Sequence, residues 1–100
     1  MSASNVYAVY KSATGQLIDG RTRMNGVYFT HSAGAAGTIQ FYNGTSDTDP
    51  LILELATTTV ADSQNFVIPE QGILFKNGCY AKFGATVTSV TILAEGGAPA

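Results

Sequence analysis

The residues that could act as a nucleophile and its base are few in this 100-residue sequence. His31 is the only histidine, so a serine or cysteine nucleophile would have to use it as the general base. It stands beside Thr30 and Ser32 at the end of an expected strand, and the only cysteine, Cys79, is far away in the sequence. No nucleophile motif surrounds either residue. We therefore expect His31 to be a solvated or hydrogen-bonded side chain, and we expect that the protein is not an enzyme.

The seven acidic side chains are dispersed, and two of them could form a glycosidase pair only if the fold brought them together across a cleft. They are Asp19, Asp47, Asp49, Glu54, Asp62, Glu70 and Glu95. Residues 47–49 resemble the start of a calcium loop, but the glycine and closing glutamate of an EF-hand are missing, so we expect a polar turn. Residues 34–37 lack the lysine of a phosphate loop, and no helix is expected after them. The sequence therefore predicts neither a metal site nor a cofactor site.

Charge and hydropathy exclude two classes of partner. Five basic residues against seven acidic ones give a net charge of -2, and the only basic cluster is Arg21-Thr22-Arg23. We interpret this cluster as a solvated strand face, because binding to nucleic acid calls for a concentrated cationic stripe. No apolar run approaches the ~18 residues of a membrane-spanning helix. The first five residues lack the basic start and apolar stretch of a secretory signal, so we expect synthesis in the cytosol.

Short runs rich in valine, isoleucine, threonine and aromatic residues alternate with glycine-containing turns along the whole sequence. This spacing predicts an all-β fold, a single antiparallel β-sandwich or jelly-roll-like barrel of about eight short strands. Residues 1–95 would form the domain and residues 96–100 a flexible tail. Residues 51–60 are the best helix candidate, but the β-branched run 57–60 and the missing capping box favour a strand and a loop. Strands are expected near residues 5–11, 16–24, 27–31, 38–42, 51–57, 65–68, 73–76, 79–83 and 86–93.

Two asparagine-glycine pairs carry most of the information on topology. Asn77-Gly78 separates two apolar runs and predicts a tight two-residue hairpin between them, because both residues tolerate a positive φ angle. Asn25-Gly26 fits two structures equally well. It could form a second hairpin between residues 21–24 and 27–30, or it could lie in one long strand that carries a β-bulge at Gly26. The sequence leaves both structures open.

Alternation of side chains predicts which residues are buried. Val27, Phe29 and His31 share one strand face, as do Ile39 and Phe41, and Val90 and Ile92. Cys79 is expected to be a small buried hydrophobic residue. Two short segments are instead apolar on both faces, which a small two-layer domain can rarely cover, so we expect them to contact a partner subunit. Alternatively, a long loop folds over them. The candidate contact residues are Leu51, Ile52, Leu53, Ile73, Leu74 and Phe75.

Four stretches covering most of the chain carry a resemblance in spacing and residue type: 20–29, 36–44, 68–81 and 87–92. In these stretches the chain resembles small all-β virion proteins of tailed bacteriophages, of the capsid decoration or cement type. The resemblance implies a homo-oligomer on the capsid surface of the virion, made in the host cytoplasm, that bridges capsomers by binding the major capsid protein. It also implies a trimer, because such proteins often sit at three-fold positions. It transfers neither a catalytic residue nor a capsid-contact position.

Two further interpretations remain open. Exposed tyrosines could serve as stacking platforms in a tail or fibre adhesin or in a carbohydrate-binding β module. The candidates are Tyr7, Tyr10, Tyr28, Tyr42 and Tyr80. A head-completion or connector protein, which occurs in rings of few copies, is another structural possibility. For a decoration protein, the expected strand at residues 5–11 is the candidate edge for pairing with a capsid strand.

Overall fold

The computed structural model describes residues 6–34, 36–69 and 72–100, and all regular secondary structure in these residues is β-strand. The predicted all-β fold is confirmed. The described residues form ten strands rather than about eight: β1 (Tyr7–Lys11), β2 (Gly15–Asp19), β3 (Thr22–His31), β4 (Thr38–Asn43), β5 (Leu51–Ala56), β6 (Asp62–Val67), β7 (Ile73–Phe75), β8 (Gly78–Phe83), β9 (Val87–Glu95) and β10 (Ala98–Pro99).

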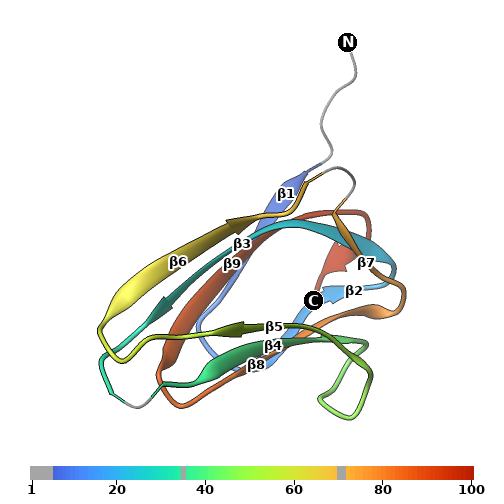
Figure 1. Ribbon diagram of the computed structural model, residues 1–100. Coiled ribbons are helices and arrows are strands. Elements are labelled where there is room, and N and C mark those ends of the chain that lie inside the picture. Colours follow the sequence, from blue (N-terminus) through green and yellow to red (C-terminus); the bar gives the residue numbers. More distant parts are fainter. Residues whose placement is uncertain (1–5, 35, 70–71) are drawn as a thin grey trace.

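The strands form two antiparallel sheets that pack face to face, so the fold is a sandwich (Figure 1). We call the first one sheet A. Its order is β1-β9-β3-β6, and β7 pairs with the first residues of β3 on the edge that β6 occupies farther along. The second one, sheet B, has the order β10-β2-β8-β4-β5. The edge strands are therefore β1, β6 and β7 in sheet A, and β10 and β5 in sheet B.

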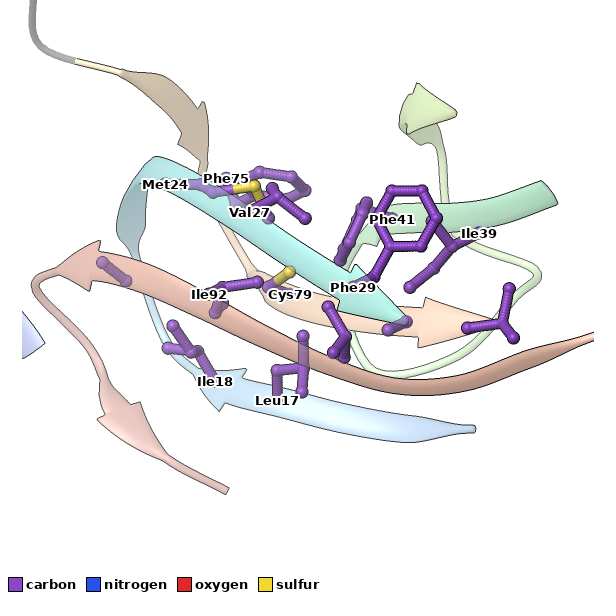
Figure 2. Close-up of a cluster of buried hydrophobic side chains, with 14 residues drawn as sticks. Leu17, Ile18, Met24, Val27, Phe29, Ile39, Phe41, Phe75, Cys79 and Ile92 are labelled. Carbon is purple, nitrogen blue, oxygen red and sulfur yellow. The ribbon is translucent and has the colours of Figure 1, made fainter. Parts of the chain in front are cut away.

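The core lies between the sheets, and both contribute to it in the alternation that the sequence predicts. Phe29 from β3 and Phe41 from β4 are fully buried, as is Ile92 from β9 (Figure 2). Burial of each such side chain stabilises the fold by roughly 1.5–3 kcal/mol relative to an exposed position. The predicted buried position of Cys79 is also confirmed.

Asn25-Gly26 does not form a hairpin. It lies within the single long strand β3, and the pairing of β3 with β9 shifts register between Met24 and Gly26, so Asn25 is a bulge residue. The long strand with a bulge is the alternative that the structure confirms. The strand expected at residues 16–24 is instead divided, because Gly20 has a φ of 84° and the chain passes there from β2 in sheet B to β3 in sheet A.

The hairpin predicted at Asn77-Gly78 is wrong. The strand before this pair, β7, belongs to sheet A, whereas the strand after it, β8, lies between β2 and β4 in sheet B. The pair is therefore a corner between the sheets. It is held by the Asn77 amide, which donates to Asn43 Oδ1 at 2.8 Å, and by the Gly44 amide, which donates to the Gly78 carbonyl at 3.1 Å.

The C-terminal residues also differ from the expected flexible tail. Gly96 and Gly97 turn the chain with positive φ angles, and Ala98–Pro99 then pair with β2 as the short strand β10. The Ala100 amide donates to the Leu17 carbonyl at 3.1 Å. Proline is tolerated at this position because β10 is an edge strand and needs no donor on its outer side.

Candidate functional site

The six candidate contact residues do not form one surface, because β5 lies in sheet B and β7 in sheet A. Leu51 and Ile52 are exposed on edge strand β5, at 47% and 40% of their surface, whereas Leu53 packs against the core. On β7, Ile73 packs against the core and Leu74 is half-buried. Phe75 is fully buried in the core, so its expected contact with a partner is corrected. Of the six candidate residues, Leu51 and Ile52 are therefore accessible to a partner on β5, and the half-buried Leu74 lies at a separate edge on β7.

His31 is buried rather than solvated, with only 3% of its surface exposed. Its ring centroid lies 6.1 Å from that of Phe29, and its Nε2 atom lies 3.4 Å from Nε2 of Gln64. Within the described part of the chain, Nδ1 has no hydrogen-bond partner. The side chain points into the sandwich because His31 occupies the inward face of β3, in alternation with Phe29. It therefore packs as a core residue and presents no base to solvent.

Cys79 is buried on β8 in the centre of sheet B. Desolvation by burial raises the pKa of its thiol from 9.0 to about 12. A thiol is nucleophilic as its thiolate, so this cysteine is unreactive at neutral pH. His31 lies on β3 in the other sheet, and the structure does not join the two residues by any hydrogen bond that it describes.

The acidic turn at residues 47–49 is a hydrogen-bonded loop. Asp49 Oδ2 accepts hydrogen bonds from the backbone amides of Thr45 and Ser46, at 2.9 and 3.1 Å, and so closes the loop onto its own earlier residues. Asp47 forms an exposed ion pair with Lys82 at 3.3 Å. Across the described residues, no group of three or more histidine, cysteine or acidic side chains lies close enough to hold a metal ion.

The outward side of sheet A brings two of the candidate tyrosines together with polar residues from the neighbouring strands. Strand register places Tyr10 of β1 opposite Thr91 of β9, Thr91 opposite Tyr28 of β3, and Tyr28 opposite Asn65 of β6. Residues that lie opposite one another in this way share a sheet face. Tyr10 and Tyr28 have 66% and 46% of their surface exposed. We call these four residues the tyrosine row.

A groove runs beside the tyrosine row, with a volume of about 160 Å³. Its floor is at Gly26, where the absence of a side chain leaves a depression between Leu93 of β9 and Val67 of β6, which are the residues paired with it. Of the described residues that line the groove, none is charged. The lining residues are Asn25, Gly26, Val27, Tyr28, Asn65, Phe66, Val67, Thr91 and Leu93.

The other three tyrosines are tied into the fold. The Tyr42 side chain is buried, and its hydroxyl donates to Gln40 Oε1 at 2.8 Å. Tyr80 packs edge-on against Tyr42, with 6.3 Å between ring centroids, and the Tyr7 hydroxyl donates to the Gly96 carbonyl at 2.5 Å. Tyr10 and Tyr28 are therefore the two tyrosines that the fold presents on one exposed face. Both lie opposite Thr91 of β9, one on each side of that strand. This alignment could not be predicted from the sequence, because it depends on β9 lying between β1 and β3.

Comparisons of the chain with protein-family models, curated proteins and solved structures found no match. The described part of the chain contains no helix that is long and apolar enough to cross a membrane.

Proposed function

We propose that the protein is a capsid decoration, or cement, protein of a tailed bacteriophage. In this proposal it forms a homo-oligomer, expected to be a trimer, on the outside of the head and bridges neighbouring capsomers by binding the major capsid protein. The resemblance to small all-β virion proteins supports the proposal. The structural observation that carries it is the exposed apolar edge of sheet B, formed by Leu51 and Ile52 on β5.

An apolar sheet edge suits assembly for two reasons. Its backbone N–H and C=O groups can pair with a strand of another chain, and its apolar side chains lose contact with water when they do so. Soluble proteins usually protect such an edge with charged residues, but Glu54 is the only charged residue in β5. We therefore place the contact between copies at β5.

The strand β1 is an edge strand of the other sheet, sheet A. We propose that this edge pairs with a strand of the capsid. Within the described residues, β9 is the only strand that pairs with β1. Asn5, the first residue of the expected edge, lies outside the described residues. In a head under pressure from its packaged genome, an oligomer that binds several capsid subunits at once resists their separation, because its individual contacts act together.

Heads assembled without the protein provide the test of this proposal. Such heads are expected to assemble but to lose their genome at a lower temperature or lower salt concentration than complete heads, and adding the purified protein should restore them. Heads that are equally robust without the protein, combined with failed adsorption to host cells, would favour the adhesin interpretation.

The role of β5 is tested separately by light scattering coupled to size exclusion. Ile52→Asp is expected to convert the oligomer into a monomer, because it places a charge in an apolar contact. Val60→Asp is the matched control, since it makes the same change at a side chain that is 67% exposed and lies after β5. An Ile52→Asp protein with the mass of the wild-type oligomer would contradict this assignment of the interface.

A further inference from the structure

We propose that the outward face of sheet A binds a neutral polysaccharide, an extended chain of β-1,4-linked pyranose rings that crosses the strands along the tyrosine row. This binding site goes beyond capsid decoration and lies on a different sheet from the contact at β5, although Tyr10 belongs to β1, the strand whose edge we propose to pair with the capsid. The proposal rests on three properties of the face: the spacing of its two exposed tyrosines, the groove beside them, and the uncharged polar groups that surround both.

The spacing of the tyrosines fits alternate rings of an extended sugar chain. Tyr10 and Tyr28 lie on β1 and β3, and both are opposite Thr91 of the intervening strand β9. Neighbouring strands lie about 4.8 Å apart, so the two tyrosines are offset by roughly 10 Å across the sheet. An extended β-1,4-linked chain advances by a similar distance over two rings. Each aromatic face can therefore stack on the C–H face of a pyranose, with one intervening ring above Thr91.

The groove provides room for a ring beside Tyr28. Gly26 contributes no side chain to the groove, and a β-carbon there would lie in ordinary contact with its lining, 3.4 Å from Leu93 Cδ1 and 3.4 Å from the Phe66 carbonyl oxygen. Its volume of about 160 Å³ is suited to one sugar ring rather than to a folded partner. Among the described residues that line it, none is charged, which favours a neutral ligand over a charged one.

Polar groups lie where the sugar hydroxyls would be. Asn65 continues the tyrosine row on β6, and Thr91 stands between the two tyrosines. Two positions along β3 from Tyr28, the Thr30 hydroxyl lies 2.6 Å from that of Ser89 and 2.6 Å from that of Thr88. Hydroxyl and amide groups both donate and accept hydrogen bonds, which matches the hydroxyl groups of a sugar. Aromatic surface combined with such groups is typical of sites that recognise an amphipathic ligand.

A second copy of the chain is a less suitable occupant of this face. The large apolar side chains exposed on it are Tyr10, Tyr28, Leu93 and Val67, and hydroxyl and amide groups lie among them. A stable interface of standard size takes roughly 20–30 residues from each side and has a continuous apolar centre. The depression at Gly26 interrupts this face where such a centre would lie.

The test is a titration of the full-length protein with cellohexaose, followed by the chemical shifts of its backbone amides. Shifts are expected at the tyrosine row and along the groove, and maltohexaose, whose α-1,4 linkage makes it coil, should produce smaller ones. Tyr10→Ala and Tyr28→Ala should each weaken binding by roughly 2- to 13-fold, since each removes one aromatic stacking contact. Tyr28→Phe keeps the aromatic face and should bind as the wild type does.

Two further variants separate binding from folding. Val60→Ala removes a side chain as exposed as Tyr10, at 67% compared with 66%, from a loop outside the face, and should leave binding unchanged. Gly26→Ala places a methyl group on the groove floor at ordinary contact distances and should weaken binding while the protein stays folded. The absence of shifts with cellohexaose, shifts confined to sheet B, or wild-type binding by both tyrosine variants would overturn the proposal. So would a change in oligomeric mass in those variants, which would make the face an interface between copies.

Discussion

The corner at Gly78 gives the most specific prediction about the fold. Gly78 has a φ of 116°, in the region that only glycine adopts readily. A β-carbon at this position would lie 2.8 Å from the Ile18 carbonyl oxygen and 3.2 Å from the Gly44 carbonyl oxygen. Both obstacles are backbone atoms of sheet B and its loop, so they cannot move aside as a flexible side chain would. Gly78→Ala therefore combines backbone strain with a steric clash.

The expected loss of stability follows from these two effects. A positive φ angle costs an alanine about 1–2 kcal/mol, and crowding in a packed interior typically costs about 1–3 kcal/mol. The reduced entropy of the unfolded chain offsets about 0.4–1 kcal/mol. The net loss is about 1–4.6 kcal/mol, and its midpoint, near 3 kcal/mol, lowers Tm by roughly 12–24 °C for a domain of this size.

Gly20→Ala is the matched control, because Gly20 also has a positive φ, 84°, and also lies between a strand of sheet B and a strand of sheet A. Its β-carbon would meet only the Cα atom of Gly97, at 3.9 Å, so strain acts there without a clash. We expect Tm to fall by only about 5 °C. Thermal unfolding, monitored by far-ultraviolet circular dichroism, measures Tm for both variants. All samples are compared at one protein concentration, because assembly also shifts Tm. Equal losses in the two variants would refute the reasoning.

Two further predictions concern buried side chains. Burial raises the pKa of Cys79 to about 12, so between pH 9 and pH 12 the thiol loses its proton only in the unfolded chain. The free energy of unfolding should therefore be independent of this thiol below pH 9. Above pH 9 it should fall by up to about 1.4 kcal/mol per pH unit. Chemical denaturation of the wild type and Cys79→Ala across this range measures the difference, and equal slopes would contradict the burial argument. His31→Ala should lower the free energy of unfolding by about 1–3 kcal/mol, because it leaves a cavity beside Phe29, and should leave binding to heads unchanged. A folded variant that loses a measured activity would instead give His31 a functional role.

Much of the fold can be predicted from the sequence, because local patterns determine it. Alternating apolar residues identify the inward faces of β3, β4 and β9, and the β-branched run after β5 correctly favours a strand over a helix. The failure at Asn77-Gly78 has a physical cause. The dipeptide specifies a turn, but the sheet that each flanking strand joins depends on partners distant in the sequence, which are β3 for β7 and both β2 and β4 for β8.

The candidate surfaces could be predicted only in part. The sequence identifies Leu51 and Ile52 as apolar residues that a small sandwich has difficulty covering, and the structure leaves both exposed. It gives the same prediction for Phe75, which is wrong because β7 extends β6 along the edge of β3 and directs this ring into the core. The tyrosine row cannot be predicted, since it requires the order β1-β9-β3-β6, in which no two neighbours are consecutive in the chain.

The proposed role in capsid decoration is tested most directly by the copy number of the chain in purified virions. Quantitative mass spectrometry of intact particles, with the major capsid protein as the internal reference, provides this number. The proposal predicts a fixed and simple ratio to the major capsid protein, as expected for a trimer at repeated positions over the whole head surface. A single small ring of copies per particle would contradict it and identify a connector or tail component instead.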